Sequence, residues 1–225
     1  KLTLNGNWGD PMMHPDLIEM LEIWNYHHPE SSLFIATNGS MRSKQFWLDL
    51  ARVSRQFPNS KVDFAVDGLA DTHHLYRRKT IFSKLIENIK HFTSAQGNAC
   101  MMMTVFKHNQ HQIKDAKELS TKLGFDHFRL EHSDRWLGKK DLMPDREFVD
   151  TYYQQQQKVL IDENYKADMQ PYCLIKNKPA KALYIDAEGD FYPCCWMATY
   201  RYKFNSLFSP KQKQFNIKNN SLKDI

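Results

Sequence analysis

The sequence predicts an α/β protein built from repeated strand–helix units, and three observations lead to this class. Five apolar, strand-like runs begin near residues 2, 33, 62, 101 and 126. Each run stops in a cluster of Gly, Asn, Asp, His or Arg, and a segment with helical periodicity usually follows. The resulting order, βαβαβαβαβ, is typical of parallel strands joined by right-handed helical crossovers.

The first two units have the same design. An apolar run over Leu2–Pro11 is followed by a helix expected over His14–His28, where Pro15 suits the first turn. The apolar positions of this helix recur at helical spacing: Leu17, Ile18, Leu21 and Trp24. The second unit combines a run over Leu33–Ser40 with a helix over Ser43–Phe57.

The third and fourth units continue the alternation. A run over Val62–Gly68 precedes a helix expected over Ile81–Phe92, and a run over Met101–Asn109 precedes a helix over Gln110–Leu123. Gly124 stands where a left-handed cap is expected to end the fourth helix.

The fifth run, His127–Arg135, is the last of the series. A complete barrel of this kind needs about eight units. The five units therefore predict a partial TIM-like barrel, or else an open sheet.

The alternation of strand-like and helix-like segments ends after the fifth unit. A polar connection leads from Trp136 to a helix expected from Asp145 to about Asn164. Beyond it, the stretch Ala182–Cys195 is typical of a β-hairpin with its turn at Ala187–Asp190. We therefore expect a barrel core over residues 1–165 and a small cysteine-bearing module over residues 166–225.

Composition narrows the class of protein further. The 31 Lys and Arg residues exceed the 26 Asp and Glu residues by five, but both signs are mixed along the chain. This balance weakly permits nucleic acid as a partner without arguing for it, so nucleic acid is an unlikely partner. No apolar run approaches the roughly 18 residues of a membrane span, and no signal peptide is recognisable. Four cysteines are too few for a disulfide scaffold. These features predict a soluble protein of the cytoplasm.

The strand ends carry the residues that suggest chemistry, because a βα repeat gathers them on one face. The turn Gly6–Pro11 brings two glycines to a strand end but lacks the Lys-Ser/Thr of a phosphate-binding loop. The dipeptides Asn38-Gly39 and Asp67-Gly68 are ordinary turn dipeptides when taken singly. Carboxylates near strand ends are candidate acids or bases, with a solvated rim position as the default: Asp63, Asp67 and Glu131.

Cysteine and histidine are the candidate metal ligands. Cys173 and Cys194 flank the expected hairpin in the pattern C-x15-G-x4-C, and Cys195 adjoins them, which is compatible with zinc or iron–sulfur ligation but supplies only three ligands. Cys100 lies within the Met-rich fourth strand and is expected to be a buried thiol. The histidine pairs, including His73-His74 in an expected loop, are interpreted as surface or capping residues.

Taken in order, these motifs resemble the radical S-adenosylmethionine (SAM) superfamily, in particular members with a SPASM or twitch auxiliary domain. Gly6–Leu17 is similar to the family's second-strand turn, Gly-Gly-Glu-Pro-Leu-Leu-His-Pro-Asp-Leu, and Thr37–Gly39 to its third-strand Thr-Asn-Gly. Asp67-Gly68, then His73 and Tyr76-Arg77, resemble its fourth-strand Ser-x-Asp-Gly and the following His and Tyr-Arg.

The resemblance extends to the rest of the chain, and it implies a partial (β/α)6 TIM-like barrel with strands 2 to 6 present. Lys107–Asn109 and the helix that follows fit the family's fifth unit, and the spacing of Cys173, Gly189 and Cys194 fits the opening half of the auxiliary domain. Phe215–Ile225 is similar to the Gly-Asn-Ile…Ser-Leu-x-x-Ile-Trp segment that follows it.

The resemblance implies a role for each matching residue. Residues 9–11 would hold the amino end of SAM, Asn38 would lie at the rim, Asp67 near the ribose and Arg77 at the carboxylate. Residues 9–11 are Gly9, Asp10 and Pro11. Auxiliary iron–sulfur ligands would be the cysteines of the second module: Cys173, Cys194 and, less firmly matched, Cys195.

Three departures from the family pattern stand in the sequence. The C-x3-C-x2-C motif that holds the SAM-cleaving 4Fe-4S cluster is absent and would lie upstream of Lys1, so the chain is expected to be a fragment truncated at both ends and catalytically silent by itself. Ala65 stands at the family's fourth-strand serine, and Asp10 replaces a glutamate.

The function that the resemblance implies is reductive cleavage of SAM to a 5'-deoxyadenosyl radical, which abstracts hydrogen from a peptide or small-molecule substrate. The cofactors would be SAM, the 4Fe-4S cluster and an auxiliary iron–sulfur cluster, and the electron donor a flavodoxin or ferredoxin. One alternative is a non-catalytic binding protein with a structural zinc at Cys173 and Cys194. Another is an iron-free barrel enzyme such as an aldolase or isomerase, although no lysine stands convincingly at a strand end to form a Schiff base.

Overall fold

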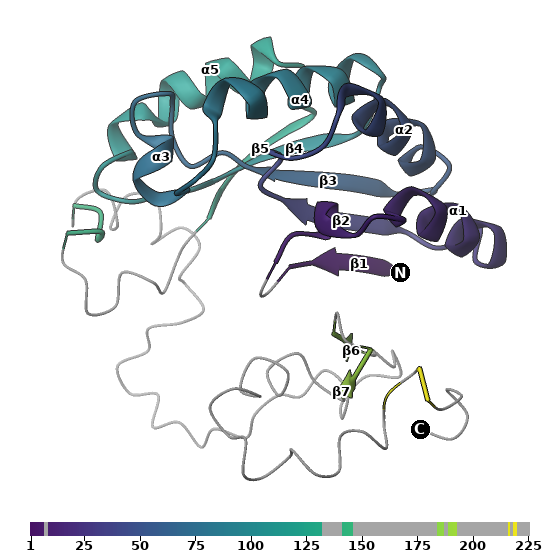
Figure 1. Ribbon diagram of the computed structural model, residues 1–225. Helices are drawn as coiled ribbons and strands as arrows, with labels where there is room; N and C mark the ends of the chain where they lie inside the picture. The colour runs from purple at the N-terminus through teal and green to yellow at the C-terminus, as the bar shows by residue number, and fades with distance from the viewer. Residues whose placement is uncertain are drawn as a thin grey trace, which may run out of the picture. The chain divides into compact units, whose positions relative to one another are not determined.

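The computed structural model describes residues 1–6, 9–131, 141–145, 184–186, 189–192, 216 and 218–219 (Figure 1). The chain divides into two compact units, Lys1–Leu160 and Ile161–Ile225. The domain boundary expected from the sequence, between residues 165 and 166, lies outside the described residues, as does the helix expected beyond Asp145.

The first unit contains a five-stranded sheet in which every neighbouring pair of strands is parallel. The strands are β1 (Leu2–Asn5), β2 (Leu33–Thr37), β3 (Ser60–Ala65), β4 (Ala99–Thr104) and β5 (His127–Glu131). Their order in the sheet is the order of the chain, β1-β2-β3-β4-β5. A doubly wound open sheet reverses direction at a switch point, whereas a barrel adds strands in sequence. The winding is therefore that of a partial barrel, as predicted.

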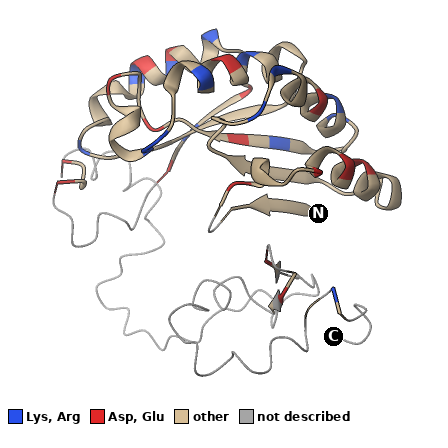
Figure 2. Cartoon of the chain, viewed as in Figure 1, with Lys and Arg blue, Asp and Glu red and all other residues tan. Residues whose placement is uncertain are grey.

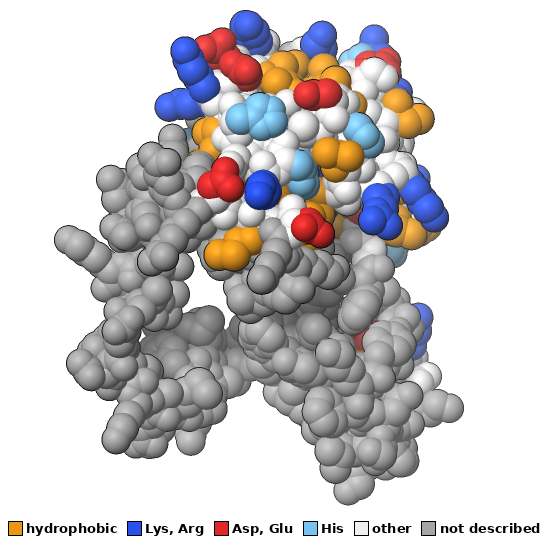
Figure 3. Space-filling view, turned by 90° about the vertical axis from the view of Figure 1, so that its left-hand side faces the viewer, with side chains coloured by type: hydrophobic (Ala, Val, Ile, Leu, Met, Phe, Trp, Pro, Cys, Tyr) orange, Lys and Arg blue, Asp and Glu red, His pale blue; other side chains and the backbone are white. Residues whose placement is uncertain are grey.

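The helices connect successive strands and cover one face of the sheet (Figure 1). They are α1 (Leu17–His27), α2 (Lys44–Ser54), α3 (His73–Tyr76), α4 (Phe82–Ser94) and α5 (Ile113–Lys122), with 3-10 turns η1 (Pro11–Met13) and η2 (Gln110–Gln112). Helices on a single face are what a barrel requires, because its other face lines the lumen. Among the described residues, acidic and basic side chains are interspersed over the helical layer (Figures 2 and 3).

Local signals explain where several elements begin and end. The Ser43 hydroxyl accepts a hydrogen bond from the Phe46 N–H (3.4 Å) and caps α2. Gly124 adopts the left-handed conformation expected of it after α5, with φ of 75°. The prediction that His73 and His74 lie in a loop is wrong. They open α3, a helix too short to show in a periodicity of apolar residues.

The core lies between the sheet and the helices, and Trp47 is its largest buried side chain. The Trp47 ring contacts Phe64 of β3 and Phe92 of α4, with ring centroids 5.4 and 6.3 Å apart. Its Nε1 donates to the Met41 carbonyl (2.9 Å). Trp47 therefore joins two helices, one strand and the loop after β2.

Trp47→Ala is expected to lower the free energy of unfolding by about 3–5 kcal/mol, since it leaves a large cavity in the core. Urea denaturation followed by circular dichroism measures the change. Gln45→Ala, on the exposed side of the same helix, is the control and should change stability by less than about 0.5 kcal/mol. Equal losses in the two variants would contradict this view of the core.

The second unit contains the hairpin that the sequence predicted. Strand β6 (Tyr184–Ile185) pairs antiparallel with β7 (Phe191–Tyr192). Gly189 in the connecting turn has a φ of 87°, which favours glycine. The Asn216 side chain donates to the Asp190 carboxylate (2.7 Å), so a later segment is tied to this turn.

In the parts of the chain that the structure describes, every helix is too short or too polar to span a bilayer.

Candidate functional site

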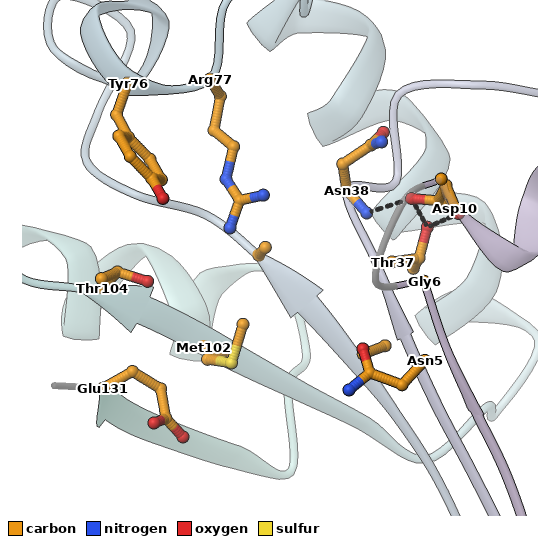
Figure 4. Close-up of a pocket in the computed structure, with 13 residues that line it drawn as sticks. Asn5, Gly6, Asp10, Thr37, Asn38, Tyr76, Arg77, Met102, Thr104 and Glu131 are labelled. Carbon is orange, nitrogen blue, oxygen red and sulfur yellow. Dashed lines mark hydrogen bonds between the residues drawn. The ribbon is translucent and has the colours of Figure 1, made fainter. Parts of the chain in front are cut away.

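A cavity of about 320 Å³ opens where the parallel strands end (Figure 4). Residues at or just after the ends of β1 to β5, together with two residues from α3 and its C-terminal cap, line it. Its volume lies near the lower end of the range of about 300–1,000 Å³ that is usual for small-molecule sites. The carboxyl end of a parallel barrel is also where such folds bind ligands.

Asp10 joins the loops that follow β1 and β2. Its carboxylate accepts hydrogen bonds from the Met12 N–H (2.9 Å), the Thr37 hydroxyl (2.8 Å) and the Asn38 N–H (2.7 Å). Two of the three partners are distant in the sequence: Thr37 is 27 residues from Asp10, and Asn38 is 28 residues from it. Asp10 therefore works first as a brace that fixes the two loops as one wall of the cavity.

Arg42 supports the same wall from outside the cavity. Its guanidinium donates to the carbonyls of Met12 (2.5 Å) and His14 (2.6 Å) and lies 5.0 Å from the centre of the Phe46 ring. Arg42 has a φ of 75°, an uncommon conformation for a residue with a side chain. The sequence carried no local signal for this role, since it depends on two carbonyls about thirty residues upstream.

Asp67 organises the opposite wall. It is fully buried, and its carboxylate accepts hydrogen bonds from Arg77 Nε (2.5 Å) and the Thr104 N–H (2.7 Å). Arg77 and Thr104 line the cavity, whereas Asp67 does not. The interpretation of Asp67 as a solvated rim carboxylate is therefore wrong. The chain packs over it and uses it to hold two residues of the wall.

Two further buried side chains hold the backbone of Asp67. The Asp67 N–H donates to His73 Nδ1 (3.1 Å), and the Asn109 amide donates to the carbonyls of Asp67 (3.2 Å) and Thr104 (3.0 Å). Burial lowers the pKa of His73 from 6.5 to about 4, against the opposing effect of Asp67. His73 is therefore neutral at pH 7, and its Nδ1 is free to accept. The expectation of a surface or capping role for this histidine is corrected accordingly.

Stability is expected to fall as the pH is lowered from about 6.5 to about 4. Over this interval the unfolded chain binds a proton at His73 that the folded chain does not, so acid favours unfolding. The contribution is of the order of 3 kcal/mol when integrated over the shift. Urea denaturation of wild type and His73→Gln at several pH values measures it, and the stability difference between the two should shrink as the pH falls. Parallel pH profiles would contradict the assignment.

The sheet itself forms the floor of the cavity. Ala36 on β2, Ala65 on β3 and Met102 on β4 present small or apolar side chains between Asn5 on β1 and Glu131 on β5. Figure 4 labels Asn5, Met102 and Glu131. Ala65 has no hydroxyl, so its side chain contributes no hydrogen bond to the floor.

Glu131 forms an ion pair with Arg129, which also contacts Asp63 at 2.6 Å. Asp63 is fully buried, and Lys61 lies 3.5 Å from its other oxygen. The prediction that Asp63 is a solvated rim carboxylate is therefore wrong, because two cations of neighbouring strand positions compensate its charge.

The residues singled out from the sequence divide into three groups. Gly9, Asp10, Asn38 and Arg77 line the cavity. Pro11 begins η1 and Asp67 lies behind Arg77, and neither is part of the lining. The third group, Cys173, Cys194 and Cys195, lies outside the described residues.

Sequence reasoning missed Asn5, Met102 and Thr104 of the lining. A signal was available for the last two, because positions two apart on a strand face the same side of a sheet. Met102 is paired with Ala65 and Arg129 in the register of the sheet, which places it on the face that carries the cavity.

Metal ligands do not gather in the described part of the chain, where no group of three or more His, Cys, Asp or Glu side chains could hold an ion. Cys100 is buried, as predicted, and burial raises the pKa of its thiol.

No protein-family model matches the sequence, and no curated protein matches it. Solved structures do match the fold. SuiB from Streptococcus suis superposes with a TM-score of 0.59 at 16% identity, over 96% of this chain and 53% of SuiB. The protein anSMEcpe with bound AdoMet gives 0.57 at 15% identity, over 96% and 61%. A domain of pyruvate-formate lyase-activating enzyme from Bacteroides vulgatus gives 0.50 at 17%, over 69% and 88%.

These neighbours are radical SAM enzymes. SuiB has also been solved with S-adenosylmethionine and with its precursor peptide SuiA, and anSMEcpe with the peptide Cp18Cys. The chain spans about half the length of SuiB. At 14–17% identity the likeness concerns the fold, so the chain shares with these enzymes a partial barrel with its parallel sheet wound in order.

Proposed function

We propose that this chain is the SAM-binding part of a radical SAM enzyme and that SAM occupies the cavity at the strand ends. One observation carries the proposal. Segments that resemble the family's SAM-binding motifs, separated by up to 68 residues from Gly9 to Arg77, converge on a single cavity in the described structure. Convergence of this kind does not follow from any one motif, since each motif is an ordinary turn by itself.

The methionine end of SAM fits the polar walls. Arg77 uses its Nε for Asp67, which leaves its terminal nitrogens for a carboxylate, and Figure 4 shows the guanidinium turned toward the cavity. On the other wall, a Cβ on Gly6 would lie 2.0 Å from the Gly9 carbonyl oxygen, so the turn needs glycine at this position. Gly6 and Gly9 are exposed, and their backbone is suited to the amino group.

The nucleoside end fits the floor. Ala36, Ala65 and Met102 present small or flexible apolar surface, and Thr104 and Asn5 add hydrogen-bonding groups at its edges. Apolar surface with polar groups at its edges is suited to a nucleoside. The described residues thus provide for both ends of the ligand.

The iron–sulfur cluster would be held by cysteines outside this sequence, which contains no C-x3-C-x2-C. When bound beside SAM, such a cluster supplies the electron that cleaves SAM to methionine and a 5'-deoxyadenosyl radical. The residues of this chain then orient SAM through Arg77 and the Asp10-braced loops and separate it from water. Cys173 and Cys194, with Cys195, are proposed ligands of an auxiliary cluster in a SPASM-like or twitch-like module.

A peptide is the proposed substrate class, and a flavodoxin or ferredoxin the proposed electron donor. Support for a peptide comes from the neighbours, since SuiB and anSMEcpe have been solved with peptides. The hydrogen-abstracting activity would belong to the whole parent protein.

Isothermal titration of the 225-residue chain with SAM tests the binding part of the proposal. We expect saturable binding, weaker binding of adenosine, and no binding of ADP, since the cavity lacks a phosphate-binding loop. A folded chain that shows no saturable binding of SAM up to about 1 mM would overturn the proposal. In the anaerobically reconstituted parent protein, formation of 5'-deoxyadenosine under reducing conditions tests the chemistry.

A further inference from the structure

The loop that follows β2 brings Asn38 to the cavity, and its shape depends on a helix that does not line the cavity. Within this loop the Asn38 side-chain carbonyl accepts hydrogen bonds from the Ser40 N–H (3.0 Å) and the Ser40 hydroxyl (2.5 Å). The Asn38 N–H donates to Asp10. These bonds fix Asn38 and Ser40, but they do not involve the carbonyls of Gly39 and Met41.

Asn88 of α4 supplies the donors for these two carbonyls. Its amide nitrogen donates to the Gly39 carbonyl (2.9 Å) and to the Met41 carbonyl (3.0 Å), and the side chain is fully buried. The Met41 carbonyl also accepts from Trp47 Nε1. A buried carbonyl without a donor is costly, so removal of Asn88 bears mainly on Gly39.

The backbone at Gly39 allows little adjustment. Its φ is 66°, and a Cβ built there would lie 2.6 Å from Leu85 and 2.8 Å from Phe64. Leu85 precedes Asn88 by three residues, so the two share one face of α4. Helix α4 therefore contacts the loop through the apolar side chain of Leu85 and the hydrogen-bonding side chain of Asn88. Only Asn88 determines the direction of the loop carbonyls.

We propose that Asn88 is a positioning residue for the ligand site, acting through Gly39 to set the place of Asn38. The proposal rests on the proposed function, since it assumes that the cavity binds SAM. Asn88 itself does not line the cavity. A buried polar residue that faces only the back of a ligand-binding loop is expected to affect affinity through loop geometry.

The test is the affinity of the 225-residue chain for SAM, measured by isothermal titration at a temperature where every variant is fully folded. Asn88→Ala is expected to weaken binding about tenfold. Asn88→Asp, which places a carboxylate oxygen against the two carbonyls, should weaken it at least as much. Ile89→Ala is the matched control. Ile89 is the next residue of α4, equally buried, and makes no hydrogen bond to the loop through its side chain, so its loss should leave affinity within about twofold.

Wild-type affinity in Asn88→Ala would overturn the proposal, and so would an equal loss in Ile89→Ala, which would show that core packing alone matters. If wild type does not bind SAM, the proposed function fails, and the positioning role is then decided without ligand. Amide chemical shifts of Asn38, Gly39 and Ser40 should move in Asn88→Ala and stay in place in Ile89→Ala. Unchanged shifts in Asn88→Ala would overturn the positioning role as well.

Discussion

Arg77→Gln is expected to weaken SAM binding by about 10- to 100-fold while the chain stays folded. A hydrogen bond to a charged group contributes about 1.5–3 kcal/mol, and the proposed carboxylate contact uses the terminal nitrogens of Arg77. Glutamine keeps an N–H donor but loses the charge and the paired geometry. Titration calorimetry of wild type and variant with SAM measures the difference.

The next residue along the chain gives a matched control. Arg78 is exposed and does not line the cavity, so Arg78→Gln removes the same charge from the same region without touching the site. Its affinity for SAM should equal that of wild type. Arg77→Lys keeps the charge but cannot reproduce the planar fork, so its affinity should fall between those of wild type and Arg77→Gln. Equal losses in the variants at positions 77 and 78 would show that net charge, rather than a contact, attracts the ligand.

Asp67→Asn is expected to lower the free energy of unfolding by about 2–3 kcal/mol and to weaken SAM binding together with it. Asparagine can still accept from the Thr104 N–H, but its amide would face the Nε of Arg77, donor against donor. Loss of one partner from a fully buried ion pair costs about 3–5 kcal/mol. The partly exposed Arg77 regains some hydration, so the smaller figure is expected.

Urea denaturation of Asp67→Asn, Arg77→Gln and the double variant separates the pair from its surroundings. Because the two side chains are in contact, their effects on stability should fall short of additivity by at least about 0.5 kcal/mol. Asp115→Asn, an exposed carboxylate in the first turn of α5, is the control and should change stability by less than about 0.5 kcal/mol. Additive effects at positions 67 and 77 would mean that the buried carboxylate does not hold the arginine.

The regular part of the fold was predictable because it depends on local periodicity. The five strands and the helices α1, α2, α4 and α5 each carry an apolar pattern long enough to read, and parallel pairing follows from their alternation. The four-residue helix α3 could not be read in this way. Its position depends on the hydrogen bond between the Asp67 N–H and His73.

The location of the cavity could be predicted from the sequence, but the hydrogen bonds that build its walls could not. Strand ends of a βα repeat meet on one face, so Gly9 and Asn38 were expected there, whereas Arg77 was expected from the family resemblance. The buried state of Asp67 was not, because the partner that covers it, the Thr104 N–H, is 37 residues away and contributes only a backbone group. The roles of Asn88 and Arg42 could not be predicted for the same reason. Both side chains donate to backbone carbonyl oxygens, which every residue carries.

The central claim is that SAM binds in the cavity at the strand ends, and chemical-shift mapping of the isotopically labelled chain during titration with SAM tests it most directly. The account predicts saturable shifts at Gly9, Asn38, Arg77 and Thr104, with the same midpoint at each. Absence of saturable shifts, or shifts gathered around the separate surface cavity along α1 that Met20, Trp24 and His28 help to line, would contradict it.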